Sequence, residues 1–402
     1  MKQETKLTAH GLMITLLACL LQGVQYLSNN AWTYGYTAAY ESWGITLIQI
    51  GVMASACQLA KSITNFFGGV LIEKFGYKRV LLACAAGFAL VPILTVFFYK
   101  SYTALLILRI IAGASACAIY AGCNLMAFEN LPPQNRALAH GIILAGPNVG
   151  IVLGSFLLPT MIQKFGWKAG FLTAGAIVVV IMIAFAILVK EGGKAEVAQK
   201  KEKAADYTKN VIKACLNKNW ILGTLANFII VGIVMGLGTY LTLYLTQEKG
   251  LSLIEAGAIT GAASLVGFFA NPLSGIISDA IHSRKWVTIP SVLLYAFGVA
   301  GFVWFGSKAA LIAIRPLNVM VAESVPGEYM ASTSGIYNAV SFFGSSFSPI
   351  IFGAVLTATG TYSAILYTTA ILACVAGVIQ LFMKETWTGK ALKSKDEVEQ
   401  EN

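Results

Sequence analysis

Residues 44–79 read GITLIQIGVMASACQLAKSITNFFGGVLIEKFGYKR and align without a gap on residues 250–285, which read GLSLIEAGAITGAASLVGFFANPLSGIISDAIHSRK. The offset is 206 residues, and the matched pairs include Gly44/Gly250, Gly51/Gly257, Asn65/Asn271, Gly69/Gly275 and Glu73/Asp279. A second block, at an offset of 194 residues, pairs Asn124/Asn318, Glu129/Glu323, Pro132/Pro326, Ala137/Ala331 and Gly141/Gly335. The chain is therefore predicted to consist of two homologous halves, an arrangement in which one half can rock against the other.

The composition around this repeat is that of a membrane protein. Of the 402 residues, 57% are hydrophobic and 11% are charged, whereas an average soluble domain has about 25% charged residues. A soluble fold cannot hide so much apolar surface, so a soluble enzyme and a disordered chain are both disfavoured. The net charge of +10 does not indicate a nucleic-acid partner, because such a protein needs a basic patch with few apolar runs.

Apolar runs long enough to cross a bilayer fill most of the chain. A spanning helix needs about 20 apolar residues, and the predicted spans are 8–30, 45–72, 80–99, 102–126, 138–160, 169–189, 219–245, 256–278, 286–306, 309–322, 332–358 and 361–383. We therefore expect an all-α integral membrane protein with twelve transmembrane helices in two pseudo-symmetric six-helix bundles. Its predicted parts are an N-terminal half (1–190), a charged cytoplasmic linker (191–218) and a C-terminal half with a cytoplasmic tail (219–402).

The basic residues predict the orientation of these spans. Of the 28 Lys and Arg residues, 20 fall in segments on the side of the two termini and five fall in segments on the other side. Because Lys and Arg concentrate in cytoplasmic loops, both termini are expected in the cytoplasm of a cell in whose membrane the protein lies. The end of the linker, around residues 207–216, is expected to form an interfacial helix.

The tenth span is unusual. The two offsets differ by 12 residues, which indicates a deletion between Arg315 and Asn318. The remaining span, 309–322, has Arg315-Pro316 in its middle, and proline breaks or kinks a helix. We expect a short, bent or non-spanning tenth helix, while its counterpart at 102–126 runs its full length. A variant of the fold that senses rather than transports therefore stays open as an alternative.

Three motifs carry a family resemblance. The segment from Gly69 to Arg79 resembles the signature G-x-x-x-D/E-R/K-x-G-x-R/K-R/K of the major facilitator superfamily, and Gly275…Asp279…Arg284-Lys285 is a weaker copy. Arg109-x-x-x-Gly113 and Gly146-Pro147-x-x-Gly150-x-x-x-Gly154 resemble that family's motifs in the fourth and fifth helices. The resemblance implies transport by alternating access. It also implies a gate formed by Gly69, Glu73, Lys74, Gly76, Arg79, Gly275, Asp279 and Arg284.

Particular roles follow for the motif residues. The resemblance implies that Glu73 latches a helix end of the opposite half, where a carboxylate meets a positive helix N-terminus. Glycine at Gly69 and Gly76 would permit close packing and a tight turn. We interpret Gly150 and Gly154 as a face of small residues for contact between helices rather than as evidence of antiport.

Ionisable residues inside the spans are the first candidates for a functional site. They are Lys61, Arg109 and Arg315, and all are cations. Since no Asp or Glu lies well inside a span, coupling to protons through a buried carboxylate is disfavoured, although His140 could carry a proton. Lys61 shares one helical face with Ser55, Gln58, Ser62 and Asn65. It is either a counter-charge for an anion or a lysine that reaches the membrane surface, and Arg109 likewise has a structural or a substrate-binding role.

The predicted substrate is a small organic anion, because the cations have no partner acids. The resemblance implies that the first, fourth, seventh and tenth helices line the cavity. The candidate binding residues are therefore Gln25, Asn29, Gln58, Lys61, Arg109, Tyr240 and Tyr244. An exporter of drugs or metabolites is the alternative. We expect no enzyme activity, catalytic residue, metal or cofactor, since three scattered His residues form no HExxH motif. The expected partners are this substrate and the lipid bilayer, and the protein is expected to be a monomer.

Overall fold

The structure of the chain is a computed structural model that describes residues 9–131, 136–189, 204–283, 285–305 and 330–385. Its elements, as far as described, are helical. In the first half they are α1 (Ala9–Ser42), α2 (Leu47–Phe75), α3 (Tyr77–Phe98), α4 (Tyr102–Ala114), α5 (Ile119–Glu129), α6 (Arg136–Phe165) and α7 (Trp167–Leu188). The linker contains α8 (Ala204–Cys215). The second half contains α9 (Lys218–Leu243), a π-helical turn (Tyr244–Glu248), α10 (Leu253–Ala280), α11 (Lys285–Phe305), α13 (Met330–Thr359) and α14 (Ser363–Leu381).

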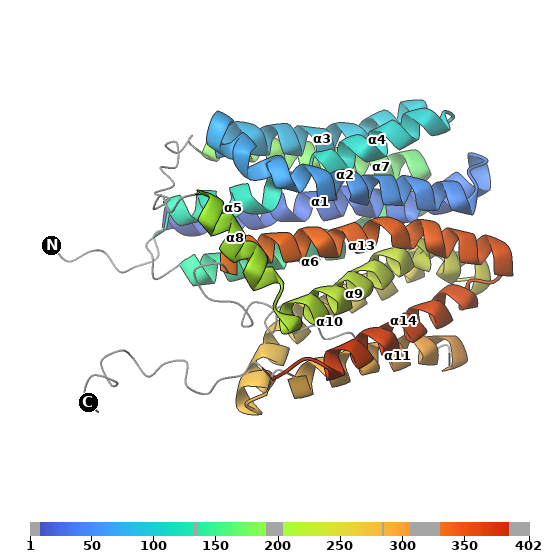
Figure 1. The fold of residues 1–402 in the computed structure, drawn as a ribbon. Helices are drawn as coiled ribbons and strands as arrows, with labels where there is room; N and C mark the ends of the chain where they lie inside the picture. The colour runs from blue at the N-terminus through green and yellow to red at the C-terminus, as the bar shows by residue number, and fades with distance from the viewer. Residues whose placement is uncertain (1–8, 132–135, 190–203, 284, 306–329, 386–402) are drawn as a thin grey trace, which may run out of the picture.

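The long helices run roughly parallel, with α1 to α7 on one side of the bundle and α9 to α14 on the other (Figure 1). The halves meet where α2 packs on α13 and where α6 packs on α10. The start of α1 and the end of α14 lie at the same end of the bundle (Figure 1), which we call the terminal end. The end with the turns after α1, α6 and α9 is called the opposite end.

Local sequence explains where the helices begin and end. Thr46 caps α2 in a capping box, in which its side chain accepts from the backbone of Gln49 and the Gln49 side chain accepts from the Thr46 backbone. Between α2 and α3 the chain turns at Gly76, whose φ is 83°. Gly166, with φ of 85°, makes the same turn between α6 and α7. Glycine adopts this left-handed conformation without the steric cost of a Cβ atom.

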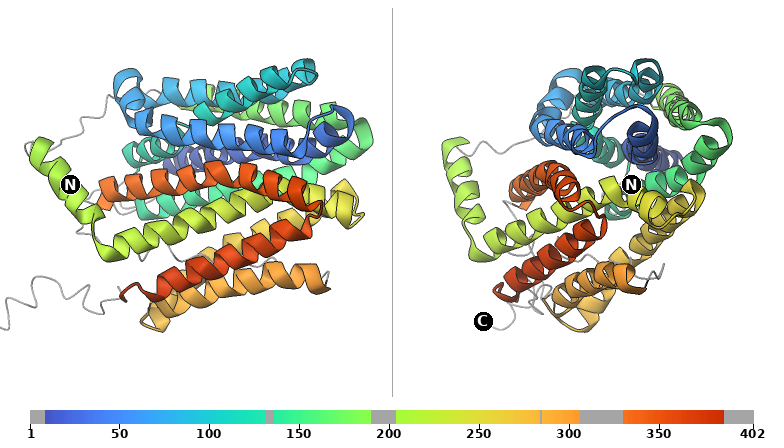
Figure 2. Two further views of the ribbon diagram at one scale, coloured as in Figure 1. Left: turned by 45° about the vertical axis from the view of Figure 1, so that its right-hand side comes forward. Right: turned by 90° about the vertical axis from the view of Figure 1, so that its right-hand side faces the viewer.

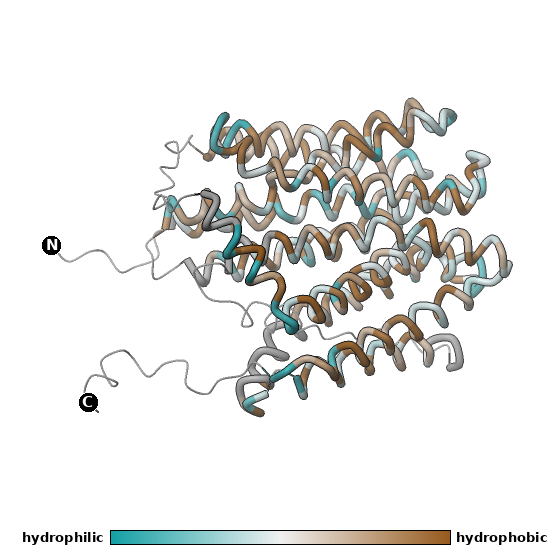
Figure 3. The backbone as a smooth tube through the Cα atoms, in the orientation of Figure 1, coloured by the Kyte–Doolittle hydropathy of each residue, from teal (hydrophilic) through white to brown (hydrophobic). Residues whose placement is uncertain are grey.

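The outer surface of the bundle is apolar, as a lipid-facing surface must be. Eight stretches of helix among the described residues are long and apolar enough to cross a membrane. Ile187 of α7 is 75% exposed and Phe297 of α11 is 69% exposed. Figure 3 shows apolar residues along most of the helices and hydrophilic ones concentrated toward the helix ends. A soluble monomer rarely exposes so continuous an apolar surface, so this belt is the surface that contacts lipid.

Small residues allow the helices of the first half to pack closely. A Cβ atom on Gly150 would overlap the carbonyl oxygen of Gly23, and one on Gly146 would overlap that of Cys19. A Cβ atom on Gly154 would overlap the side chain of Asn30. The interpretation of Gly150 and Gly154 as a helix-contact face is therefore confirmed, and the partner helix is α1.

Two predicted spans differ from the observed helices. The first, 8–30, continues to Ser42, because residues beyond 30 include Trp32, Tyr34 and Tyr36, which are buried in the protein rather than exposed to lipid. The fourth, 102–126, is not one continuous helix, since a turn at 115–118 separates α4 from α5. The predicted short span 309–322 lies outside the described residues.

One motif glycine has a different role from the predicted one. A Cβ atom on Gly69 would meet no atom within 4 Å, so Gly69 does not pack closely in this structure. Its neighbour Gly68 does, because a side chain there would overlap the backbone of Cys117 in the turn between α4 and α5. The predicted tight turn at Gly76 is confirmed.

Candidate substrate site

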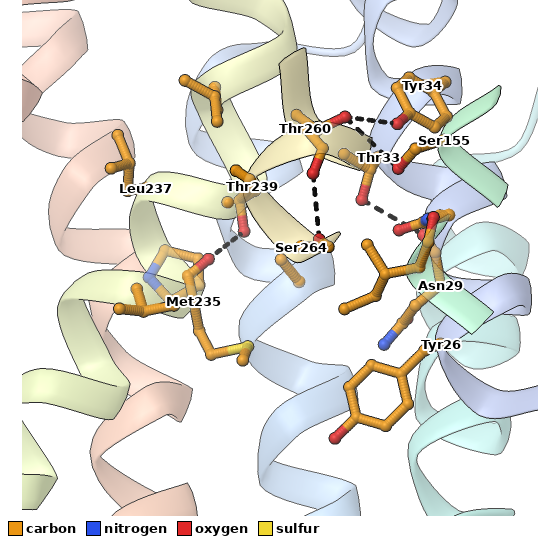
Figure 4. A pocket seen from close by; sticks show the side chains of 18 of the residues that line it. Tyr26, Asn29, Thr33, Tyr34, Ser155, Met235, Leu237, Thr239, Thr260 and Ser264 are labelled. Atoms are coloured by element: carbon orange, nitrogen blue, oxygen red, sulfur yellow. Dashed lines mark hydrogen bonds between the residues drawn. The ribbon is translucent and has the colours of Figure 1, made fainter. Parts of the chain in front are cut away.

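A cavity of about 470 Å³ lies between the two halves. Such a volume is within the usual range for small-molecule sites, about 300–1,000 Å³. Its walls come from α1, α2, α4, α6, α9, α10, α11 and α13. The polar residues that line it are Tyr26, Asn29, Asn30, Thr33, Tyr34, Tyr36, Gln58, Arg109, Asn148, Ser155, Thr239, Thr260, Ser264 and Tyr295. Figure 4 shows several of these side chains around the space.

Arg109 is the one charged residue among the described residues that line this cavity. Its side chain is 5% exposed. Arg109 Nη1 donates a hydrogen bond of 2.9 Å to Asn29 Oδ1, and the guanidinium carbon lies 5.2 Å from the centre of the Trp32 ring. Among the described residues, its Nε has no hydrogen-bond partner. Because a buried charge is stable only when it is paired or well hydrogen-bonded, this cation is a candidate partner for an anion in the cavity.

Hydroxyl groups from both halves gather elsewhere on the cavity wall (Figure 4). The Tyr34 hydroxyl lies 2.8 Å from Thr260 Oγ1, which is 3.4 Å from Ser155 Oγ. Thr239 of α9 and Ser264 of α10 also line the cavity. These groups can donate and accept hydrogen bonds, so they suit the hydroxyl groups of a substrate.

Specific contacts join the halves toward the opposite end. The Tyr240 hydroxyl of α9 lies 2.9 Å from the carbonyl oxygen of Leu47 and 3.0 Å from that of Pro349. A side chain on Gly51 or on Gly353 would overlap this hydroxyl. Two glycines from opposite halves thus make room for one hydroxyl that connects α2, α9 and α13. Gln247 also donates to Glu41 across the halves.

We expect Tyr240→Phe to increase the fraction of molecules in which the two halves are separated at the opposite end. A net hydrogen bond contributes about 0.5–1.5 kcal/mol, so the ratio of open to closed molecules should rise by roughly two- to tenfold. Spin labels at positions 41 and 247, in a background without native cysteines, should then show a larger population at the longer distance. Tyr99→Phe, which changes a tyrosine at the same end within one half, is the control. An unchanged distance distribution in Tyr240→Phe would show that this hydroxyl does not hold the halves together.

Lys61 lies beside the cavity rather than in its lining. Its Nζ is 4.5 Å from the centre of the Phe342 ring of α13 and 5.5 Å from that of Tyr26, and Tyr26 lines the cavity. One turn away, Gln58 Nε2 donates a hydrogen bond of 3.3 Å to Ser345 Oγ. The ammonium group is therefore stabilised by two aromatic faces, one from each half.

The structure distributes the predicted site residues over several places. Asn29, Gln58 and Arg109 line the cavity together. Lys61 lies next to it, while Gln25, Tyr240 and Tyr244 are buried outside its described lining. On α9, the lining residues are neighbours of the predicted tyrosines, such as Thr239 and Leu241. The hydroxyl residues Tyr34, Ser155 and Thr260 were not anticipated, because Ser, Thr and Tyr are common inside transmembrane bundles and one sequence does not distinguish their faces.

The predicted gate residues lie toward the terminal end. Glu73 and Lys74 are exposed at the end of α2, and the structure shows no hydrogen bond from Glu73 to the described residues. Gly275 and Asp279 belong to α10, but the side chain of Asp279 and the whole of Arg284 lie outside the described part of the chain. The latch between Glu73 and a helix end of the other half stays a prediction.

Spanning helices in two halves, with a cavity between them that residues of both halves line, define a multi-pass membrane transporter. Comparison with known proteins agrees, since residues 18–317 match the profile of the Major Facilitator Superfamily. The chain belongs to this superfamily.

The relatives and solved structures that resemble the chain are transporters by name. The chain is 26% identical over 367 residues to the gallate transporter of Pseudomonas putida. This alignment covers 79% of each protein. It is 22% identical over 393 residues to the probable galactarate/D-glucarate transporter GudP of Bacillus subtilis (strain 168), with 87% of this chain and 86% of the relative covered. A bacterial homologue of the human lysosomal transporter Spinster, solved inward-facing and unoccupied, has the same fold, with a TM-score of 0.78 and 14% identity over 94% of this chain and 98% of the other.

Proposed function

We propose that the protein carries a small hydroxylated organic anion across the cell membrane by alternating access, with both termini in the cytoplasm. The observation that carries this proposal is Arg109, a buried guanidinium that lines the cavity and whose Nε has no partner in the described part of the chain. An anion that enters the cavity loses its hydration, and a charge-assisted hydrogen bond to Arg109 would offset that loss.

The remaining cavity wall supports a hydroxylated substrate with one negative charge. Hydroxyl groups of Thr239, Thr260 and Ser264 come from the second half, whereas Arg109 belongs to the first. A carboxylate at Arg109 and hydroxyls at these residues would connect the halves through the substrate. With one cation in the described lining, a monoanion fits better than a dianion. Gallate, the named substrate of one relative, is a hydroxylated monocarboxylate, whereas galactarate and D-glucarate, named for the other, are hydroxylated dicarboxylates.

Uptake by proteoliposomes would test this function. The purified protein should give saturable uptake of at least one hydroxylated carboxylate from a panel of gallate, glucuronate, gluconate and glucarate. Monoanions should be preferred to glucarate, and neutral glucose should not enter faster than into empty liposomes. Transport of glucose without transport of any acid in the panel would contradict the proposal.

We expect Lys61→Gln to weaken transport less than a change at Arg109. Lys61 is outside the described lining, so its charge would act on a substrate without lining the site, and a screened charge interaction of about 1 kcal/mol corresponds to about fivefold in affinity. The substrate concentration for half-maximal uptake should rise by about that factor. Lys61→Arg should give a smaller change, since it keeps the charge but alters the geometry. Wild-type half-saturation in a folded Lys61→Gln protein would exclude a role for this charge in the site.

A further inference from the structure

The amphipathic helix α8 has a surface that neither the bundle nor the proposed transport site uses. It lies at the terminal end, across the direction of the spanning helices (Figure 1). Viewed along the bundle, α8 lies at its edge, outside the ring of spanning helices (Figure 2). A helix in this position lies beside the protein at the level where the bilayer ends.

One face of α8 attaches it to the bundle. Val211 is buried, and Ala214 and Cys215 pack with Ile336 on a cluster formed by Trp220 and Tyr337. This cluster joins α8 to the start of α9 and to α13. This packing fixes which face of α8 is turned toward the bundle. Helix geometry then gives the direction in which its other residues point.

The remaining surface of α8 is divided into an apolar flank and a basic face. Ile212 is 55% exposed and Leu216, directly after the helix, is 68% exposed. Lys209 and Lys213 are exposed too. Since successive residues advance by about 100° around a helix, the two apolar residues share one flank. The two lysines, one turn apart, share the face beside it, away from the bundle.

We infer that α8 is an interfacial helix that binds the headgroups of anionic phospholipids. Its apolar flank, Ile212 and Leu216, continues the lipid-facing belt of the bundle into the interfacial region. Its basic face lies at headgroup level, and from the start of α8 to residue 218 the chain carries three lysines, Lys209, Lys213 and Lys218, against one acidic residue, Asp206. Amphipathic helices of this composition lie in the interface and are attracted to anionic lipids. Lysines on the basic face can bind phosphate groups. Because the apolar flank beside them would lie in the bilayer, we assign these phosphates to lipid headgroups rather than to a soluble partner.

Hydrogen exchange of the full-length protein in nanodiscs would test this inference. In discs that contain phosphatidylglycerol, amides of residues 204–218 should exchange more slowly than in discs of phosphatidylcholine alone. Each basic residue near an anionic surface contributes about fivefold to binding. The double variant Lys209→Gln/Lys213→Gln should lose most of this difference. Ile212→Ser/Leu216→Ser should exchange faster in both kinds of disc, because its apolar anchor is removed.

A matched control removes two exposed lysines from the opposite end, Lys164→Gln/Lys168→Gln. It changes the net charge by the same amount and should keep the dependence on anionic lipid. Equal exchange of α8 in the two lipid compositions would overturn the inference. So would loss of the difference in this control, since that result would indicate a general effect of charge.

Discussion

Arg109→Ala should raise the substrate concentration for half-maximal uptake by roughly ten- to hundredfold. Hydrogen bonds to charged groups contribute about 1.5–3 kcal/mol, and each 1.4 kcal/mol corresponds to a factor of ten. The effect should be large because Arg109 is the one charged residue in the described cavity lining. Arg109→Lys should be intermediate, since an ammonium group keeps the charge but loses the planar fork of donors. Uptake kinetics of the anion that the panel identifies would measure both effects.

Loss of folding must be separated from loss of binding in these variants. Arg109 also donates to Asn29 and stacks on Trp32, so thermal melting of each purified variant is needed beside its kinetics. Lys249→Gln, a change of an exposed cation at the opposite end, should leave half-saturation unchanged. A folded Arg109→Ala protein with wild-type half-saturation would show that the substrate does not bind at this cation.

The membrane class and the duplicated organisation could be predicted from sequence because both depend on patterns repeated over many residues. The limits of individual helices depend on contacts that hydropathy does not contain. The part of α1 beyond residue 30 is helical because side chains such as Trp32 and Tyr34 are buried in the protein, a contact that a hydropathy pattern does not show. The turn between α4 and α5 depends on how closely α2 and α3 approach, since side chains on Gly68 and Gly87 would overlap Cys117 and Ser115 there.

The candidate site could be predicted only in part, for a similar reason. Charged and amide groups such as Arg109 and Asn29 are rare in a bilayer, so they indicate a cavity wherever they occur. A tyrosine hydroxyl is less specific, because it can also bind a backbone carbonyl. At Tyr240 the carbonyls of Leu47 and Pro349 are the partners. The adjacent Thr239 faces the cavity instead.

The two neighbouring glycines of α2 should respond differently to substitution. Gly68→Leu should greatly reduce the yield of folded protein, because its side chain would overlap the backbone of Cys117. Overpacking a core costs about 1–3 kcal/mol when side chains can adjust, and a backbone group adjusts less. At Gly69 an added Cβ atom would meet no described atom within 4 Å, so we expect Gly69→Leu to keep wild-type yield and melting temperature. Size-exclusion profiles and melting curves in one detergent would compare the two variants.

Transport by Gly69→Leu distinguishes a structural role from a role in gating. The motif resemblance implies that α2 approaches the second half when the terminal end closes, and a leucine at position 69 would then obstruct closure although the present structure accommodates it. The folded variant should therefore bind its substrate with near wild-type affinity but transport it at least tenfold more slowly. Normal rates of uptake would show that Gly69 is dispensable for the cycle. Unfolding of Gly69→Leu to the same extent as Gly68→Leu would contradict the packing of α2 described above.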